Sequence, residues 1–194
     1  MPERAFLARH GQTTWNLEHR LQGQRDSPLT AEGIRQACEM AARLRGNGIR
    51  TVCSSPLGRA LRTAVIIAET LGADLVQVPE LAEVDHGEMA GLTWAEIDER
   101  FPGARAARAE NRYGWAFPGG ESYAQARSRA KEALTACGWA SDGAPLLVAH
   151  EMIGRMLRAE LRSLGRDDAL ALRHPQGVVF EIDQGTERVL SSRV

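Results

Sequence analysis

Residues 9–11 of the sequence, Arg-His-Gly, combine side chains that suit chemistry on an anion. They follow residues 5–8, a short apolar run typical of a buried strand. In an open α/β sheet, ligands bind outside the carboxyl ends of the strands, so His10 lies where a ligand can reach it. An imidazole can attack an anion while a guanidinium binds its oxygens. Gly11 lets the backbone turn sharply and approach a ligand closely. A plain hydrogen-bonded loop histidine is the alternative.

Two further strand-like runs end in polar or charged residues. Residues 49–53 lead to a helix that carries Arg59 in its first turn, and residues 146–149 lead directly to His150. Because the carboxyl ends of parallel strands meet at one edge of a sheet, we expect Arg59 and His150 to converge with residues 9–10. The helix start that carries Arg59 offers free N–H groups and a positive dipole end, which favour an anion.

Each of these residues alone also fits a structural role. Arg59 can be a solvated surface arginine, Arg62 on the same helix competes with it, and His150 can be a satisfied histidine at a strand end. Lys131 is the only lysine among the 24 basic residues, so arginine is abundant and an arginine counts here only by its position.

Alternating strand and helix signals predict the elements that position these side chains. We expect strands at residues 5–8, 49–53, 75–78, 146–149, 178–182 and 188–191, and helices at 31–45, 56–71, 93–101, 121–138 and 152–164. This order predicts one α/β domain over residues 1–194: a three-layer α/β/α sandwich with a mostly parallel sheet and helices on both faces. The last two strands, joined by a turn at residues 183–185, fit an antiparallel addition at one edge.

Local signals set the predicted helix starts and faces. We expect N-caps at Thr30, Ser55 and Thr93, with Pro56 at the first helical position. The first long helix is expected to bury Ile34, Cys38, Ala41 and Leu44 or Arg45, and the second Leu57, Leu61, Ala64, Val65 and Ala68.

Composition excludes several classes of protein. The chain has 194 residues, 43% hydrophobic and 25% charged, which is ordinary for a soluble globular domain. A net charge of −1 argues against a nucleic-acid-coating protein. Cys38, Cys53 and Cys137 form no CxxC pair, so neither a disulfide framework nor a zinc site is expected, and Cys38 and Cys53 fit buried positions. No membrane span or signal peptide is recognisable, which favours a cytoplasmic location.

The chain resembles the histidine phosphatase superfamily, in the branch that includes cofactor-dependent phosphoglycerate mutases and small phosphatases. The matching motifs follow the family's order over most of the chain. They are residues 7–16, 21–23, 28–30 with 33 and 36–37, 54–60 with 63–64, 81–83 with 87 and 91, 118–122, and 148–150. The Arg-His-Gly segment and the Ser-Pro-Leu-Gly-Arg-Ala segment are the specific signals, and the final one is weaker.

The resemblance implies roles for individual residues. His10 would carry a phosphoryl group as phosphohistidine, while Arg9, Arg59 and His150 bind its non-bridging oxygens. The nearby cations would keep His10 neutral before attack by lowering its pKa. No metal or other cofactor is implied, because a cationic pocket can position and stabilise the transferred group. The implied substrate-binding set adds Asn16, Gln22 and Gly23.

Glu83 matches the residue from which the family protonates the leaving alkoxide. A carboxylic acid that stays neutral at neutral pH requires a raised pKa. A solvated loop carboxylate is the alternative, and Asp85 and Glu88 are rivals.

Three departures from the family pattern lie near this acid and the substrate mouth. Glu151 follows the final histidine where glycine is frequent, and it is unfavourable beside a phosphate unless it points away or pairs with Arg155. Residues 89–91 read Met-Ala-Gly in place of Trp-Glu-Gly, and His86 replaces an aromatic residue. These changes bear on substrate preference more than on the core chemistry.

The resemblance favours a phosphatase that takes a small phosphate monoester and releases inorganic phosphate. Residues 84–122 would form a lid that selects the substrate. Residues 93–117 are short and lack the mutases' basic cluster, although Arg105, Arg108 and Arg112 lie there and equally suit a solvated helix face. The alternatives are a phosphoglycerate mutase and an inactive phosphate-sensing or protein-binding module. Trp94, Tyr113, Trp115 and Phe117 fit either a hydrophobic mouth or core packing.

Overall fold

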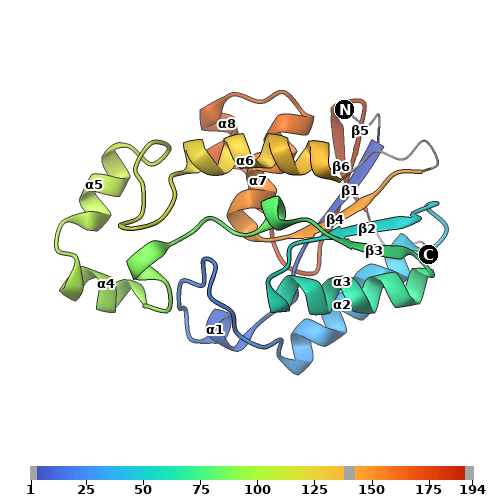
Figure 1. Ribbon diagram of the computed structural model, residues 1–194, viewed down its shortest axis with the longest axis horizontal. Coiled ribbons are helices and arrows are strands. Elements are labelled where there is room, and N and C mark those ends of the chain that lie inside the picture. The colour runs from blue at the N-terminus through green and yellow to red at the C-terminus, as the bar shows by residue number, and fades with distance from the viewer. Residues whose placement is uncertain (1–3, 138–142, 191–194) are drawn as a thin grey trace.

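A computed structural model describes residues 4–137 and 143–190, and a six-stranded sheet forms its centre (Figure 1). The strand order is β3-β2-β4-β1-β5-β6. Strands β3, β2, β4 and β1 run parallel, β5 pairs antiparallel with β1, and β6 pairs antiparallel with β5. The expected antiparallel edge is therefore confirmed. The strands are β1 (Arg4–Arg9), β2 (Thr51–Ser54), β3 (Asp74–Gln77), β4 (Leu146–Ala149), β5 (Val179–Asp183) and β6 (Thr186–Val189).

Helices cover both faces of the sheet, which confirms the predicted α/β/α layers (Figure 1). On one face lie α2 (Ala31–Leu44) and α3 (Gly58–Leu71), and on the other α6 (Tyr123–Ala136) and α7 (Glu151–Leu161). Figure 1 shows α4 and α5 extending beyond one end of the sheet. The shorter elements are α1 (Thr14–Leu17), η1 (Pro79–Leu81), η2 (Gly87–Met89), α4 (Trp94–Arg100), α5 (Ala104–Glu110) and α8 (Arg166–Ala171).

Predicted boundaries differ from the observed ones by a few residues, and residues 138 and 191, the predicted ends of one helix and one strand, lie outside the described residues. Within the described part of the chain, no helix combines the length and the apolar character needed to cross a membrane.

Strand β1 is buried on both of its faces. Its side chains alternate, so Phe6 and Ala8 join the core under α2 and α3, while Ala5 and Leu7 join the core under α6 and α7. Strand β4 alternates in the same way. Burial on both faces is typical of a central parallel strand, and it holds the carboxyl ends of both strands in place.

The helix N-caps are correct in α2 and α4 and wrong in α3. The Thr30 hydroxyl accepts the Gly33 N–H at 3.0 Å, and Thr93 forms a capping box. Helix α3 instead begins after Leu57 with no side-chain cap. Ser55 lies too early in the chain to cap α3; its hydroxyl accepts the Leu57 N–H at 3.2 Å and bonds a histidine described below.

The predicted buried face of α2 is partly wrong. Ile34 and Cys38 are exposed, although Ala41 and Leu44 are buried as expected. The helix packs by its backbone against the loop after β1: a Cβ on Gly11 would lie 2.2 Å from the Gly33 oxygen. Close backbone packing is therefore what requires a glycine at position 11. The buried α2 residues are Gly33, Ala37, Met40, Ala41 and Leu44.

The predicted face of α3 is also rotated from the observed one. Leu57, Leu61 and Val65 are only half-buried, whereas Ala64 and Ala68 are buried as expected. The rotation places Arg59 in the interior, because the helix turns that side chain toward the end of β1. The buried α3 residues are Arg59, Ala60, Thr63, Ala64, Ile67 and Ala68.

Candidate active site

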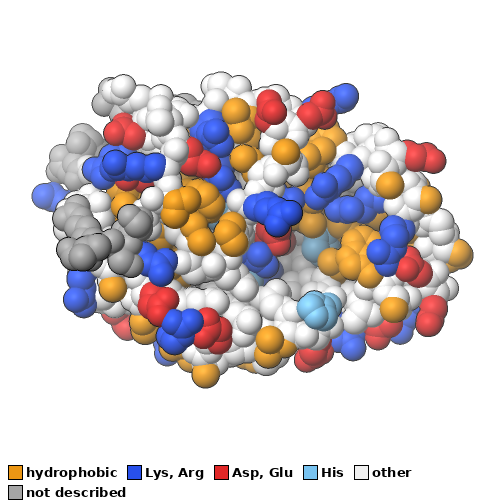
Figure 2. Space-filling model, turned by 180° about the vertical axis from the view of Figure 1, so that it is seen from behind, with side chains coloured by type: hydrophobic (Ala, Val, Ile, Leu, Met, Phe, Trp, Pro, Cys, Tyr) orange, Lys and Arg blue, Asp and Glu red, His pale blue; other side chains and the backbone are white. Residues whose placement is uncertain are grey.

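A pocket of about 150 Å³, called here the small pocket, lies at the carboxyl edge of the parallel strands. Its lining comes from the ends of β1 and β4, the first turn of α3 and the loops around α1 and η1. Figure 2 shows one face of the molecule hollowed near its middle, with basic and histidine side chains around the hollow. The lining residues are Arg9, His10, Asn16, Arg20, Leu21, Gln22, Gly23, Arg59, Glu83, His86, Glu151 and Met152.

The structure thus brings together every site residue expected from the sequence except His150, which lies behind the lining. His10 and His150 still adjoin, with ring centroids 5.1 Å apart. The rivals Asp85 and Glu88 are not part of this lining, whereas Glu83 is.

His10 is buried and held in one tautomer. Its Nδ1 lies 2.7 Å from the Gly11 carbonyl oxygen, which can only accept, so Nδ1 carries the proton. The lone pair is therefore on Nε2, which the Arg59 Nε–H approaches at 3.3 Å. Burial, reinforced by the charges of Arg9 and Arg59, lowers the pKa of His10 well below its ordinary value of 6.5. The result is a neutral imidazole whose nucleophilic nitrogen, Nε2, accepts a hydrogen bond from Arg59.

Arg59 lies in the interior through bonds to the loop before α2. Its Nη1 donates to the Arg25 carbonyl at 2.7 Å and to Asp26 Oδ1 at 3.0 Å, and its Nη2 donates to the Gly23 carbonyl at 2.7 Å. These bonds orient the guanidinium beside His10 and leave one Nη2 hydrogen for a ligand.

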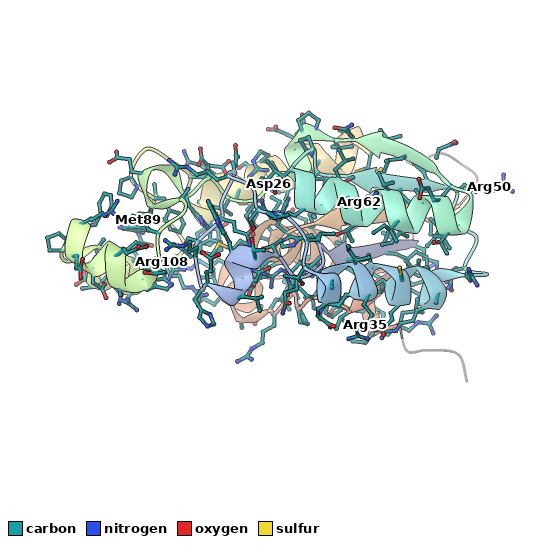
Figure 3. All side chains as sticks on the ribbon, turned by 90° about the horizontal axis from the view of Figure 1, so that it is seen from below. Asp26, Arg35, Arg50, Arg62, Met89 and Arg108 are labelled. Atoms are coloured by element: carbon teal, nitrogen blue, oxygen red, sulfur yellow. The ribbon has the colours of Figure 1, made fainter. Side chains whose placement is uncertain are left out.

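From its helix dipole, we expect the start of α3 to be open to an anion. This expectation is wrong. Asp26 Oδ1 accepts the Arg59 backbone N–H at 3.2 Å, so a carboxylate of the chain already lies at that helix end. Figure 3 labels Asp26 beside the start of α3 and Arg62 farther along the helix. Arg62 is exposed, which decides between the two arginines in favour of Arg59.

Arg9 and Glu151 form an ion pair at the mouth of the pocket. The Arg9 Nη1 lies 2.9 Å from Glu151 Oε2, and the other oxygen of Glu151 pairs with Arg155. Two arginines thus compensate the carboxylate that departs from the family pattern. The expected pairing with Arg155 is confirmed, and the contact with Arg9 is an addition to it.

The Glu83 carboxylate is fixed by the first turn of α7. Its Oε1 accepts the N–H groups of Val84 at 2.9 Å and Ile153 at 3.0 Å, and its Oε2 accepts that of Met152 at 3.1 Å. The residue is 6% exposed and lines the small pocket. A carboxyl group is therefore held in the lining of the small pocket without an arginine partner for its side chain among the described residues.

His150 takes part in a directed chain of hydrogen bonds. The Leu57 N–H donates to the Ser55 hydroxyl, whose oxygen lies 2.8 Å from His150 Nε2. Burial, with the charge of Arg59 next, lowers the pKa of His150 well below 6.5, so the ring is neutral. The neutral ring carries one proton, on Nε2 or on Nδ1, and Nδ1 has no hydrogen-bond partner within residues 4–137 and 143–190.

The remaining predicted residues offer polar groups along the pocket. Asn16 Oδ1 accepts from Thr13 and from Gln176 Nε2 at 2.8 Å, which leaves its amide N–H groups free to donate. Gln22 Oε1 accepts from Ser27 in the same manner. Gly23 has φ +54°, and a Cβ there would lie 2.8 Å from the backbone nitrogen of His86, so only glycine fits.

The family model of the histidine phosphatase superfamily (branch 1) matches residues 5–193. The chain belongs to the histidine phosphatase superfamily. One relative, named Probable phosphoglycerate mutase GpmB of Salmonella paratyphi B, is 41% identical over 146 residues, which are 75% of this chain and 68% of the relative.

Solved structures of phosphatases share the whole architecture. A mycobacterial glucosyl-3-phosphoglycerate phosphatase in complex with VO3 matches with a TM-score of 0.82 and 32% identity, over 96% of this chain and 95% of that chain. The α-ribazole phosphatase of Shigella flexneri matches with a TM-score of 0.86 and 27% identity, over 98% and 97%. The predicted family and fold are therefore confirmed, and this histidine phosphatase homologue is an enzyme of that superfamily.

Three residues that line the pocket or bind site residues could not be recognised from the sequence. His86, which departs from the family pattern, lines the pocket and packs at a tilt against Phe117, with ring centroids 4.3 Å apart. Ser55 bonds His150 instead of capping α3, and Asp26 binds Arg59. The signal for each is a contact between segments far apart in the sequence, which no local pattern reveals.

The aromatic residues within residues 93–117 pack in the core, and two arginines of this segment differ in their surroundings. Phe117 is buried, and Trp94, Tyr113 and Trp115 pack against the same core, so none of them lines the small pocket. Arg105 pairs with Asp98 at the surface, as a solvated face predicts. Arg108 does not, because its guanidinium lies over Trp94 and donates to the Tyr123 hydroxyl.

Proposed function

We propose that this enzyme hydrolyses small phosphate monoesters through a phosphohistidine formed on His10, without a metal ion. The neutral His10 ring carries this proposal, because the Gly11 carbonyl holds the proton on Nδ1 and leaves the Nε2 lone pair beside Arg59. The phosphatases among the matching solved structures support hydrolysis.

In the first step, His10 Nε2 attacks the phosphorus and the bond to the ester oxygen breaks. The guanidinium groups of Arg9 and Arg59 bind the non-bridging oxygens, and the Asn16 amide and the His150 Nδ1–H add neutral donors. Phosphoryl transfer depends mostly on positioning and charge stabilisation, which these groups supply without Lewis-acid help.

Glu83 carries the proton in both steps. It gives a proton to the leaving alkoxide, then takes one from the water that attacks the phosphohistidine, so the carboxyl group ends protonated as it began. In this second step the bond between His10 Nε2 and phosphorus breaks, inorganic phosphate leaves, and the His10 ring is neutral again. The N–H groups of Met152 and Ile153 hold Glu83 in place throughout.

The test is hydrolysis of p-nitrophenyl phosphate in EDTA by wild type, His10→Ala and Arg62→Gln. We expect His10→Ala to lose at least ~10³-fold in kcat, the scale on which loss of a nucleophile acts. Arg62 is exposed on α3 and serves as the matched control with unchanged kcat. Mass spectrometry of quenched wild type is expected to find phosphate on the peptide that holds His10. Full activity of His10→Ala would overturn the proposal.

A phosphoglycerate mutase is the second candidate, because the relative named as a probable mutase is 41% identical. A mutase must protect its phosphohistidine from water. The assay adds 3-phosphoglycerate with catalytic 2,3-bisphosphoglycerate and follows both isomerisation and phosphate release. Isomerisation faster than phosphate release would establish the mutase, and release without isomerisation would exclude it.

We propose further that residues 84–122 act as the lid that selects the substrate. His86 from this segment lines the small pocket, and α4 and α5 lie beyond the end of the sheet (Figure 1). Exchange of residues 84–122 for those of a relative is expected to change the order of preferred substrates and to leave phosphohistidine formation intact.

A further inference from the structure

The guanidinium group of Arg129, on α6, binds the backbone of the loop that carries Glu83. Its Nη1 donates to the Glu80 carbonyl at 2.7 Å and to the Ala82 carbonyl at 2.6 Å, and its Nη2 donates to the Glu83 carbonyl at 3.2 Å. Residues 82–86 belong to no named helix or strand. A side chain from another element therefore supplies hydrogen bonds that regular secondary structure does not supply to this loop.

The remaining donors of Arg129 bind the Glu121 carboxylate. Arg129 Nε lies 2.9 Å from Glu121 Oε1, and Nη2 lies 2.7 Å from Oε2. An arginine side chain has five N–H donors in a planar fork, and the contacts with the loop and with Glu121 use all five. Arg129 is thus oriented completely by the protein and has no donor left for a ligand.

Glu121 extends the hydrogen bonds of Arg129 to the chain beyond Glu83. Its Oε2 accepts the Asp85 N–H at 2.9 Å, and its own N–H donates to the Asp85 carbonyl at 2.8 Å. Burial raises the pKa of Glu121, but the hydrogen bonds from Arg129 and Asp85 outweigh burial, so the pKa is lowered and the carboxylate is charged at pH 7. Arg129 and Glu121 therefore hold the chain on both sides of Glu83.

The carboxylate of Glu83 depends on this placement of its backbone. It accepts the N–H groups of Val84, Met152 and Ile153 at 2.9–3.1 Å. These bonds would be lost if the Glu83 backbone moved by about 1 Å, because an N–H···O bond needs a donor–acceptor distance of at most about 3.2 Å. The position of the carboxylate in the small pocket thus follows from the hold of Arg129 on the loop.

A purely structural ion pair is the alternative for Arg129 and Glu121. A pair of charges removed from water is weak evidence for stability, so the bond partners decide between the two roles. Arg127, on the same helix, has a side chain of equal exposure, 17%, and pairs with Glu160 in the same way. The hydrogen bonds and ion pairs of Arg127 within the described part of the chain include none of residues 80–85. Only the Arg129 pair is directed at the loop of the acid.

We propose that Arg129, aligned by Glu121, is a positioning residue that sets the place of the Glu83 carboxyl group and so its delivery of a proton to the leaving group. The inference rests on the proposed role of Glu83 as the acid. Neither Arg129 nor Glu121 lines the small pocket, so both act through Glu83 and not on the substrate.

The test compares kcat/KM for glycerol 3-phosphate, an alkyl ester, with kcat/KM for p-nitrophenyl phosphate. This quantity covers the steps through departure of the leaving group, where only the alkoxide needs a proton. Arg129→Gln is expected to lower the alkyl-to-nitrophenyl ratio about tenfold, since a misplacement of about 1 Å can cost about 10²-fold. Both values come from one preparation, so a loss of folded protein cancels in the ratio. An unchanged ratio would overturn the proposal.

Three further variants separate positioning from charge and from stability. Arg127→Gln, the matched control, is expected to leave the ratio unchanged. Arg129→Lys keeps the charge but has three donors and no planar fork, so its ratio is expected to stay near that of Arg129→Gln. A wild-type ratio in Arg129→Lys would show that the charge acts and not the hydrogen bonds. Glu121→Gln keeps the shape of its side chain and decides the matter if Arg129→Gln does not fold. Its ratio is expected to fall about threefold, and no fall would count against the proposal.

The double variant Glu83→Gln with Arg129→Gln shows whether Arg129 acts through Glu83. Its ratio is expected to equal that of Glu83→Gln alone, because no acid is left to position. A further tenfold fall in the double variant would contradict the proposal, since Arg129 would then act by a separate route.

The amide signals of Met152 and Ile153 separate this proposal from the proposed function, because they require no turnover. Both N–H groups donate to the Glu83 carboxylate. Their signals in ¹H–¹⁵N NMR spectra are expected to move in Arg129→Gln and to stay in place in Arg127→Gln. If they move while Glu83→Gln leaves the ratio unchanged, the positioning stands and only the acid role was wrong. If Glu83→Gln lowers the ratio while Arg129→Gln changes neither ratio nor signals, the acid role stands and the positioning was wrong.

Discussion

The small pocket and residues 84–122 are built in opposite ways. In the small pocket, His10 follows β1, His150 follows β4, and the first turn of α3 carries Arg59, so the parallel sheet positions each group. Residues 84–122 contain no named strand and have only the seven-residue helices α4 and α5 with the turn η2. The first region is part of the sheet framework, and the second is attached to its end.

The two regions also differ in what orients their polar side chains, although each holds buried polar atoms without a partner among the described residues, and in the small-pocket region these are Arg9 Nε and His150 Nδ1. Gly11 and Gly23 carbonyls accept from His10 and Arg59, so backbone atoms orient the reactive groups. In residues 84–122, both His86 nitrogens and the Arg108 Nε are buried without a partner among the described residues. The framework is therefore suited to chemistry that must stay constant, and the attached segment to contacts that a substrate completes.

The largest effect is expected from Glu83→Gln. This change lies at the boundary between the two regions, because Glu83 lines the small pocket and directly precedes residues 84–122. Without the proton donor, kcat for an alkyl phosphate is expected to fall about 10²- to 10⁴-fold, the range of general acid–base catalysis. The fall with p-nitrophenyl phosphate is expected to be much smaller, because nitrophenolate leaves without a proton. Steady-state kinetics on both substrates measure the difference.

The matched control for Glu83→Gln is Glu88→Gln, an exposed carboxylate of the same loop that lies outside the small pocket. It is expected to leave kcat unchanged on both substrates. Equal losses on the alkyl and the nitrophenyl ester would contradict the role of Glu83 as the acid.

The next effect is expected from Ser55→Ala, which breaks the orientation of a framework residue. We expect the Ser55 hydroxyl to donate to His150 Nε2 and so to keep the ring proton on Nδ1. Loss of the hydroxyl then frees Nε2 to carry the proton, Nδ1 ceases to donate, and kcat is expected to fall about tenfold, as when one hydrogen bond to a charged group is lost. Ser128→Ala, exposed on α6, is the control. Phosphate inhibition is expected to weaken with kcat in Ser55→Ala, and an unchanged inhibition constant would show that the hydroxyl does not act through ligand binding.

The framework was largely predictable from the sequence, since strand periodicity and order along the chain carry it. The runs at residues 5–8 and 146–149 alternate between two cores, and their polar ends identified His10 and His150 as neighbours. Helix faces were less predictable. Ile34 and Cys38 fit an apolar stripe on α2, but the backbone contact between Gly11 and Gly33 turns that helix so that small residues face the sheet.

Contacts of the site could be predicted from the sequence where both residues belong to one segment. They could not be predicted where the two residues come from segments far apart in the chain. The Arg9–His10 pair could be recognised in place, and Glu151 with Arg155 followed from helical spacing. The contact of Asp26 with Arg59, which occupies the start of α3, joins residues 33 positions apart. A cavity of about 510 Å³, lined by Arg155 and Arg173 among others, likewise depends on how α7 meets the loop before β5.

A smaller effect is expected from His86→Phe, which tests the unpartnered polar atoms of residues 84–122. Burial, with the charge of Arg108 next, lowers the pKa of His86 to about 4, so the ring is neutral at pH 7 and its replacement removes no charge. A phenyl ring keeps the tilted contact with Phe117. The free energy of unfolding is expected to rise by about 1 kcal/mol, because buried nitrogens without partners are eliminated. Urea denaturation measures the change, and a decrease would show that the nitrogens are satisfied.

The smallest effect is expected on mild acidification, because the surroundings of His10 are expected to keep its ring neutral. The pKa of His10 is lowered by burial and then by Arg9 and Arg59, so its neutral form persists below pH 6.5, at which an ordinary histidine is half protonated. Charge appears on the ring, and nucleophilicity is lost, only as the pH falls through the lowered pKa. NMR of ¹³C-labelled histidine follows the ring Cε1 signal that disappears in His10→Ala. A midpoint at pH 6.5 or above would show that the two arginines and burial do not control this ring.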